Sequence, residues 1–221
     1  MAVESNIFGT AKTNITFMLA NNYSIIVFDL GNVLINFDYN IAIKKLDSIE
    51  QNLGRKFYDN YRANYHIHRQ FEKGLLSEEE FLEIMLSNLD HKVEAEDFCR
   101  IYSEIFEPNQ EVISLLPKLK NKYQLYLLSN TDPLHKKYGW EKYEFLSQFD
   151  HKVLSFEAKS VKPEEKIYRT VEQFSQSPSH KHLYIDDIPE YVEAAKQLGW
   201  DAIQFLNYEQ LCGELKNRGI I

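Results

Sequence analysis

One short segment, residues 24–34 (SIIVFDLGNVL), restricts the possible fold more than any other part of this chain. Its apolar side chains are continuous, as in a strand that is buried on both faces of a parallel sheet. The apolar run stops at Asp29, and Gly31 and Asn32 then turn the chain. Open α/β sheets bind ligands beyond the carboxyl ends of their strands. The segment therefore predicts a buried strand that carries a carboxylate into a ligand site, as a nucleophile or a metal ligand.

A helical block follows this segment. Over residues 41–106, aromatic side chains recur at four-residue spacing, as from Phe57 to Tyr65, which is typical of an amphipathic helix. Ser77 and Glu80 have the spacing of a capping box, which starts a helix by satisfying its first backbone N–H groups. The block shows no strand pattern. We therefore expect only helices between the first strand and the rest of the chain.

Helices and strands alternate from Pro108 onward. The expected strands are residues 123–128, 151–156, 182–185 and 201–206, and the expected helices are residues 111–122, 163–174 and 189–198, with a loop and a helix reaching residue 149. This alternation is typical of a parallel sheet with helices on both faces. The predicted fold class is therefore α/β, with a doubly wound, Rossmann-like core.

The predicted organisation has three parts. Residues 24–40 and 107–221 form the α/β core domain, and residues 41–106 form a helical cap subdomain inserted into it. Residues 1–23 are polar and show neither a helical nor a strand period, so we expect them to be a loose extension.

The overall charge narrows the choice of partners. A formal net charge of −8 argues against nucleic acid and anionic membranes as partners, because both bind basic surfaces.

No apolar stretch approaches the roughly 18 residues of a membrane-spanning helix, and the first 23 residues lack a signal-peptide pattern. Cys99 and Cys212 have no metal-ligand spacing and are expected to be reduced. We therefore expect a cytoplasmic protein that acts on a small molecule.

Polar residues gather where successive strands end. They are Asp29, Ser129, Asn130, Lys162, Asp186 and Asp187. Taken alone, each is more typical of a turn or a helix cap than of a ligand site. Strand carboxyl ends converge along one edge of a doubly wound sheet, so these side chains are expected to meet. Carboxylates, a hydroxyl beside an amide, and one cation suit a phosphate held next to Mg²⁺.

The same residues resemble the four sequence motifs of the haloacid dehalogenase-like hydrolase superfamily. The segment VFDLGNVL, around Asp29, resembles the first motif, LLSNT the second, KPEEKIY the third and YIDD the fourth. The helical block is similar to the family's cap. The resemblance covers residues 25–206. Within the superfamily, the FDLGNV start and the stretch SNTDPLH, which ends at His135, resemble bacterial sugar-phosphate phosphatases that act on glucose 1-phosphate.

The resemblance implies a magnesium-dependent phosphatase. Asp29 would attack phosphorus and form an aspartyl-phosphate, which water then hydrolyses. Magnesium would be held by Asp29, by the backbone carbonyl of Gly31 and by Asp187. Asp186 would lie next to the ion or behind its direct ligands. The ion would reduce the charge repulsion between the nucleophile and the phosphate.

The implied partner is a small phosphate ester, and the resemblance also suggests which residues bind it. Ser129 and Asn130 would hold phosphate oxygens, and Lys162 would offset negative charge as a catalytic residue. His135 follows the second motif and is a further candidate for substrate binding or proton supply. Asp38 is another possible proton donor, although its position is more typical of a cap on the following helix.

The chain departs from the family pattern at Gly31. Most phosphatases of the superfamily carry a second aspartate there, two residues after the nucleophile, as general acid and base. A general acid contributes roughly 10²–10⁴-fold to the rate. Without one, the enzyme should favour leaving groups that depart unprotonated, such as the anomeric oxygen of a sugar 1-phosphate.

Selectivity is expected to reside in the cap. His66, His68 and Arg69 are candidates to face the sugar, although a solvated helix face is more typical of such residues. Tyr138 and Trp140 are candidates to line the entrance, and core packing suits them equally well.

Two other functions remain open. A haloacid dehalogenase also uses an aspartate nucleophile and needs no acid, although it would leave the Asp186-Asp187 pair without a metal to bind. A non-catalytic phosphate-binding or scaffold protein of the same fold is the other alternative. Dependence of turnover on magnesium separates these functions.

Overall fold

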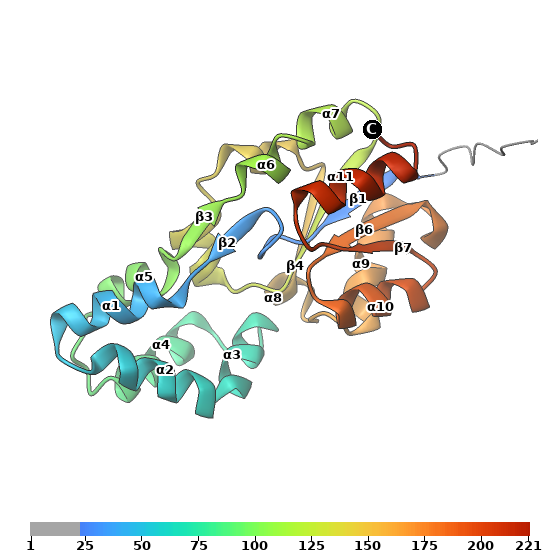
Figure 1. Ribbon diagram of the computed structural model, residues 1–221. Helices are drawn as coiled ribbons and strands as arrows, with labels where there is room; N and C mark the ends of the chain where they lie inside the picture. The colour runs from blue at the N-terminus through green and yellow to red at the C-terminus, as the bar shows by residue number, and fades with distance from the viewer. Residues whose placement is uncertain (1–22) are drawn as a thin grey trace, which may run out of the picture.

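The computed structural model describes residues 23–221, and a five-stranded sheet forms its centre (Figure 1). The strands lie in the order β5-β4-β1-β6-β7. Their bounds are β1 Ile25–Phe28, β4 Gln124–Ser129, β5 His151–Leu154, β6 His182–Asp186 and β7 Asp201–Gln204. Every neighbouring pair is parallel, which confirms the predicted α/β class with a doubly wound sheet.

Both faces of the sheet are buried. Along β1, Ile26 and Phe28 pack into one apolar cluster, whereas Ile25 and Val27 pack into a cluster on the opposite face. Helices α6, α7 and α11 cover the first face, and α9 and α10 cover the second (Figure 1). Their bounds are α6 Gln110–Ile113, α7 Leu116–Lys120, α9 Glu165–Ser175, α10 Pro189–Gln197 and α11 Tyr208–Asn217. Burial on both faces explains why β1 is apolar throughout.

Five helices, α1–α5, make up the cap, which lies at one end of the molecule (Figure 1). They are α1 Tyr39–Ile49, α2 Leu53–Ala63, α3 Tyr65–Glu72, α4 Glu78–Asn88 and α5 Ala95–Ser103. Many of their apolar side chains belong to one cluster, which includes Phe57, Phe81 and Phe98 and is joined by Leu134 from the segment after β4. The predicted capping box is present at the start of α4, where Ser77 and Glu80 exchange two hydrogen bonds.

A short antiparallel ribbon connects the core to the cap. Strand β2, Ile35–Phe37, pairs with β3, Phe106–Pro108, and Phe37 lies opposite Phe106. The expectation that residues 41–106 contain no strand is therefore wrong at its last residue. Each strand is three residues long, which is too short for an alternating pattern to be recognised in the sequence.

Other elements differ from the sequence prediction in their bounds. The helix expected over residues 111–122 is divided into α6 and α7, because Pro117 lies in the first turn of α7 and has no N–H to continue a helix from α6. The helix expected over residues 163–174 begins at Glu165, after a cis Lys162–Pro163 peptide bond. The strand expected over residues 151–156 ends at Leu154, where the short helix α8, Ser155–Ala158, begins.

Two further segments complete the core. Residues between β4 and β5 form a π-helical turn, His135–Trp140, and a 3₁₀ turn, Glu144–Gln148. Helix α11 was not predicted. Its Leu211 and Leu215 are fully buried in the apolar cluster on the first face of the sheet.

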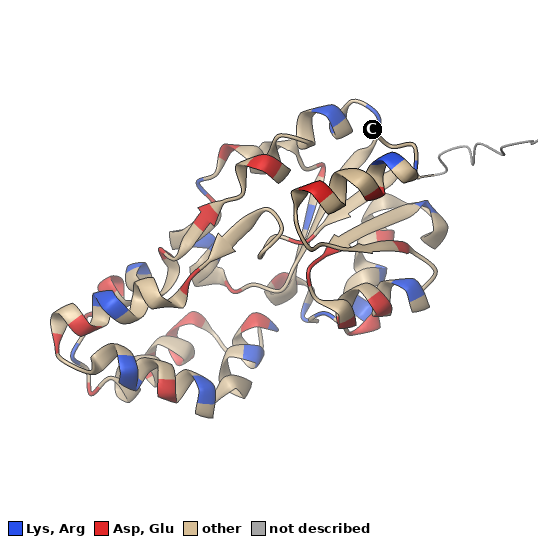
Figure 2. Ribbon diagram, in the orientation of Figure 1, with Lys and Arg blue, Asp and Glu red and all other residues tan. Residues whose placement is uncertain are grey.

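The expected loose extension, residues 1–23, falls almost entirely outside the described residues. Tyr23, the first described residue, packs against the core and donates its hydroxyl to Asp201. Within residues 23–221, none of the helices has the length and apolar character to cross a membrane. Cys99 and Cys212 are both free thiols. Figure 2 shows acidic and basic segments interspersed along the cap helices.

Candidate active site

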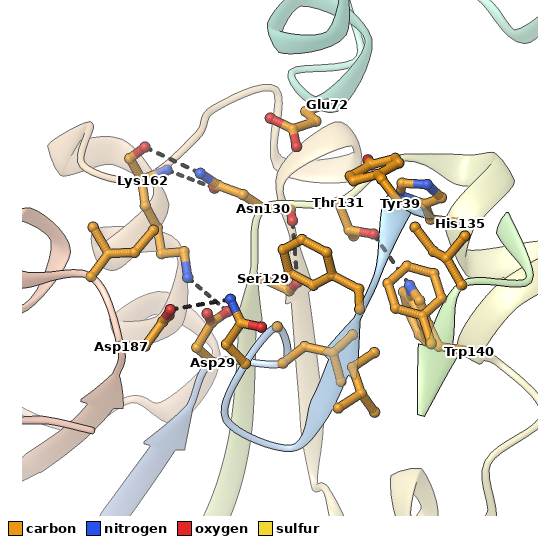
Figure 3. A pocket seen from close by; sticks show the side chains of 18 of the residues that line it. Asp29, Tyr39, Glu72, Ser129, Asn130, Thr131, His135, Trp140, Lys162 and Asp187 are labelled. Carbon is orange, nitrogen blue, oxygen red and sulfur yellow. Dashed lines mark hydrogen bonds and ion pairs between the residues drawn. The ribbon is translucent and has the colours of Figure 1, made fainter. Parts of the chain in front are cut away.

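The polar strand ends meet at one edge of the sheet, as the motif spacing predicts. Strands β4, β1 and β6 are neighbours, and their carboxyl ends bring Ser129, Asp29 and Asp186 side by side. A pocket of about 190 Å³ opens between this edge and the cap (Figure 3). Its core-side wall includes Asp29, Ser129, Lys162 and Asp187.

Lys162 lies at the centre of the charged part of the site. Its Nζ is 2.7 Å from Oδ1 of Asp29 and 2.7 Å from Oδ2 of Asp186, and the side chain is only 1% exposed. The two carboxylates raise the pKa of Lys162 although burial opposes this change. The prediction placed Lys162 at the head of a helix, whereas it lies in the loop between α8 and α9. The loop allows the ammonium group to reach back between two strand ends.

Asp186 is satisfied by several donors. Besides the Lys162 ammonium, Oδ2 accepts the hydroxyl of Tyr184, and Oδ1 accepts the backbone N–H of Ile188 at 2.8 Å. Asp187 accepts a hydrogen bond from Nδ2 of Asn32 at 3.3 Å, its one side-chain donor among residues 23–221. Asp186 therefore orients Lys162, while Asp187 keeps more of its oxygen surface open to the pocket.

Burial dominates the electrostatics of Asp29. Loss of solvent raises the pKa of Asp29 to about 7, and Asp186 and Asp187 act in the same direction, while Lys162 opposes them. Burial also raises the pKa of Asp187. One ammonium group therefore faces three carboxylates, and a second cation would favour the ionised forms of Asp29 and Asp187.

The donor set fits a divalent metal ion. Carboxylate oxygens of Asp29, Asp186 and Asp187 all lie within 4.8 Å of one another. Hard oxygen donors are the ligands that Mg²⁺ takes, commonly from one or two carboxylates. Since Asp186 is already bonded to three donors, Asp29 and Asp187 are the carboxylates best placed to hold the ion. Gly31 also lines the pocket, next to Asp29 in the turn after β1.

Ser129 and Asn130 occupy different positions at the end of β4. Ser129 is buried against the pocket floor, and its hydroxyl lies 3.4 Å from the carbonyl of Asn130. The Asn130 amide clamps the backbone of Lys162: Oδ1 accepts the Lys162 N–H at 2.8 Å, and Nδ2 donates to the Lys162 carbonyl at 3.2 Å. Asn130 thus positions the loop that carries Lys162. The Ser129 hydroxyl makes a long hydrogen bond to a carbonyl, so it is more available than Asn130 to bind a ligand.

His135 lines the pocket on its far side, beside the cap (Figure 3). Its Nδ1 is 3.0 Å from Asp132, which also accepts the hydroxyl of Tyr102 at 3.0 Å. The imidazole stacks on Tyr102, with ring centroids 4.2 Å apart. Nε2 is buried and has no hydrogen-bond partner among residues 23–221. The sequence identified His135 but missed Asp132, which fixes its orientation.

The remaining candidates from the sequence differ in whether they line the pocket. Asp38 caps α1 by accepting the N–H of Asn40, and it does not line the pocket. His68 is buried inside the cap, and His66 is exposed. Arg69 lines the pocket. These positions assign Asp38 to helix capping and leave Arg69 as the cap candidate that reaches the site.

The two aromatic candidates also differ. Trp140 is buried, touches the pocket and donates its Nε1–H to Thr131 at 3.2 Å. Tyr138 donates to Glu96 on the surface of the cap and does not line the pocket.

Several pocket residues were not predicted from the sequence. They are Asn32, Tyr39, Tyr61, Tyr65, Glu72 and Tyr191. Of these residues, only Glu72 could be found from local sequence. It follows Arg69 by three residues, so the two side chains share one helix face. The tyrosines follow ordinary helical spacing, which does not distinguish a pocket wall from a packed core.

The position two residues after Asp29 lies against an aromatic ring. A Cβ placed on Gly31 would lie 3.4 Å from the ring of Phe37, which itself lines the pocket. The space that an acidic side chain would need is therefore next to an apolar surface. Asn32, the following residue, adopts a left-handed backbone with φ of 52° and turns the chain into β2.

Comparison with known proteins finds a matching family and related enzymes. The family model described as haloacid dehalogenase-like hydrolase matches residues 23–199. A D-ribitol-5-phosphate phosphatase from Bacteroides thetaiotaomicron is 26% identical over 190 residues, which cover 81% of this chain and 90% of that protein.

Solved structures show the same similarity. A haloacid dehalogenase family enzyme from Bacteroides thetaiotaomicron, in complex with magnesium and inorganic phosphate, has a TM-score of 0.73 and 27% identity, covering 86% of this chain and 98% of that one. An L-2-haloacid dehalogenase from Xanthobacter autotrophicus has a TM-score of 0.59 at 18% identity, covering 90% of this chain and 84% of that one. The second similarity concerns the fold alone.

Proposed function

Since the chain belongs to the haloacid dehalogenase-like hydrolase family, we propose that it is a magnesium-dependent phosphatase for small sugar or polyol phosphates, with Asp29 as the nucleophile. The observation that carries the proposal is the grouping of Asp29, Asp186 and Asp187 around Lys162 at one strand edge. The related enzyme complex with magnesium and phosphate, and the related ribitol-phosphate phosphatase, support the reaction class.

The chain's own residues would divide the work of the reaction. Asp29 would attack phosphorus and form an aspartyl-phosphate, while the P–O bond to the sugar or polyol oxygen breaks and that oxygen takes a proton from water. Water would then hydrolyse the aspartyl-phosphate, which releases inorganic phosphate and restores Asp29. Ser129 would donate its hydroxyl to a phosphate oxygen, and Lys162 would hold Asp29 in position while offsetting its charge. Magnesium, bound by Asp29 and Asp187 with the Gly31 carbonyl, would supply a Lewis acid that neutralises phosphate charge.

The preferred leaving group follows from Gly31. With no acid at this position and Phe37 beside it, the first step would favour substrates whose leaving oxygen departs unprotonated. Sugar 1-phosphates meet this condition better than alkyl phosphates do. A polyol phosphate is the second candidate, because the related phosphatase is named for D-ribitol 5-phosphate.

The alternatives receive less support. A dehalogenase has no phosphate charge to neutralise, whereas Asp187 adds a carboxylate beside the nucleophile. A non-catalytic binding protein would have no need for a nucleophile held 2.7 Å from a buried lysine.

The test is phosphate release from glucose 1-phosphate and from ribitol 5-phosphate, with magnesium and with EDTA. The wild type should release phosphate only with magnesium, and Asp29→Asn should lower kcat by about 10⁴ or more. Asp59→Asn, an exposed cap residue away from the pocket, is the matched control and should retain full activity. Halide release without metal would support the dehalogenase, and ligand binding without turnover would support the binding protein.

A further inference from the structure

The cap contributes one ion pair to the pocket. Arg69 and Glu72 of α3 both line it, and Nη1 of Arg69 lies 3.0 Å from Oε2 of Glu72. About a quarter of each side chain is exposed, at 27% and 25%. Figure 3 places Glu72 across the pocket from Asp29. The pair therefore faces the part of a substrate that lies beyond the phosphate.

The guanidinium group of Arg69 already has partners within the protein. While Nη1 pairs with Glu72, Nη2 donates to the backbone carbonyl of Lys162 at 3.1 Å. Among the residues that line the pocket, Arg69 and Lys162 are the lysine and arginine side chains, and both are held by carboxylates. The cap side thus offers no unpaired arginine or lysine to a second anionic group on the substrate.

Three tyrosines also line the cap side of the pocket. The ring centroids of Tyr39 and Tyr61 are 5.3 Å apart, and those of Tyr61 and Tyr65 are 5.7 Å apart. Burial raises the pKa of each, so all three remain neutral hydroxyls. Neutral hydroxyls and one carboxylate suit hydrogen bonding to an alcohol group.

We propose that the Arg69–Glu72 pair selects substrates whose leaving group is uncharged and bears hydroxyls, and rejects those with a second phosphate or a carboxylate. This inference rests on the proposed phosphatase function. Glu72 would accept a substrate hydroxyl, because a carboxylate has free lone pairs beside its arginine partner. A substrate carboxylate at the same place would meet Glu72 as a like charge and would find Arg69 already paired.

The test uses two substrate pairs that differ by one group. Glycerol 3-phosphate and 3-phosphoglycerate differ by CH₂OH against COO⁻, and ribitol 5-phosphate differs from 5-phosphoribonate in the same way. We expect wild-type kcat/KM to favour the alcohol in each pair by at least about 10-fold, since like charges at close range repel. Glu72→Gln should reduce this preference by at least about 10-fold, mainly by lowering KM for the carboxylates, because Arg69 becomes available to them.

The matched control is Glu83→Gln, which removes the same charge from an exposed position of the cap outside the pocket. It should leave the preference unchanged. A wild-type preference for the carboxylates, or an unchanged preference in Glu72→Gln, would overturn the inference.

A binding measurement separates this inference from the proposed function. In the Asp29→Asn background with magnesium, calorimetric affinities for the same four compounds should show the same preference for alcohols. Preference in binding without any turnover by the wild type would refute the phosphatase and retain the selectivity. Turnover of all four compounds at similar rates would retain the phosphatase and refute the selectivity. If Glu72→Gln fails to fold, the wild-type preference between the alcohol and carboxylate substrates still tests the inference.

Discussion

The core and the cap bury polar groups in opposite ways. In the core, Lys162 is 1% exposed and makes ion pairs of 2.7 Å with Asp29 and Asp186. In the cap, His68 is 3% exposed, and neither ring nitrogen has a hydrogen-bond partner among the described residues. Its neighbours are aromatic rings, with the centroid of Tyr61 at 4.2 Å. The core thus pairs its buried lysine with carboxylates, whereas the cap packs the imidazole of His68 among aromatic rings.

The difference follows from the charged groups that each region buries. A buried charge is expensive unless it is paired. The core places its buried lysine between two carboxylates at the strand edge. The cap contains no such group in its apolar cluster, and it presents its charged pair, Arg69 and Glu72, to the pocket. The buried ion pairs thus lie in the core, and the partly exposed pair that lines the pocket lies in the cap.

Removal of the core cation should produce the largest effect on stability. Lys162→Met leaves Asp29 and Asp186 buried without their ammonium partner. We expect the free energy of unfolding to fall by about 3–5 kcal/mol, the usual result of removing one partner of a buried pair. Urea unfolding of the wild type and the variant at neutral pH measures the change.

A second substitution separates charge from packing in that result. Adding Asp29→Asn to Lys162→Met removes one of the uncompensated carboxylates and should recover part of the lost stability. If the double variant is as unstable as the single one, loss of packing around the lysine stem explains the effect, and the contrast between core and cap disappears.

The unpaired histidine predicts a smaller, pH-dependent effect in the cap. Burial lowers the pKa of His68 to about 4, with His135 acting in the same direction and Asp132 opposing it. The unfolded chain binds this proton near pH 6.5, so unfolding takes up a proton between these values. The free energy of unfolding should therefore fall as the pH decreases, by about 2 kcal/mol from about pH 7 to about pH 5. Urea unfolding at the two pH values provides the measurement.

His68→Phe isolates this contribution, since other groups titrate in the same range. Phenylalanine suits a site surrounded by Tyr61, Phe81 and Tyr102. The wild type should lose more stability than the variant on acidification. Parallel pH curves for the two proteins would show that His68 is solvated or paired, and would remove the contrast with Lys162.

The sequence determines the core side of the site well and the cap side poorly. Asp29, Ser129 and Asp186 each end a local apolar run, and parallel topology then brings the ends together. Lys162 was identified by its motif, although its position in a loop was not.

The cap side depends on contacts between distant segments. Glu72 faces the pocket because the end of α3 packs against the core, where its carbonyl accepts the Ser155 hydroxyl at 2.6 Å. Arg69 is tied to the carbonyl of Lys162, which is 93 residues away. No periodicity within α3 reports these contacts. The three-residue strands of the β2–β3 ribbon were missed for a related reason, since their pairing is long-range.

A carboxylate added on the core side should change the preference between leaving groups. Gly31→Asp places an acid two residues after Asp29, where the added Cβ would lie in van der Waals contact with the ring of Phe37. We expect the ratio of kcat/KM for glucose 1-phosphate to that for ribitol 5-phosphate to fall by about 10-fold, below the full contribution of a well-placed general acid. Gly31→Asn, which has the same shape and no acid, is the control. An equal change in both variants would assign the effect to shape.

The smallest predicted effect lies on the exposed surface of the cap, where polar groups satisfy one another locally. The Ser77 hydroxyl accepts the N–H of Glu80 at 3.1 Å, and the Glu80 carboxylate accepts the N–H of Ser77 at 2.8 Å. Ser77→Ala should lower the free energy of unfolding by about 1 kcal/mol, because one N–H at the start of α4 loses its side-chain acceptor. Ser77→Asp retains an acceptor and should restore most of the loss in urea unfolding. A loss as large as that of Lys162→Met would mean that the cap, like the core, depends on individual polar contacts.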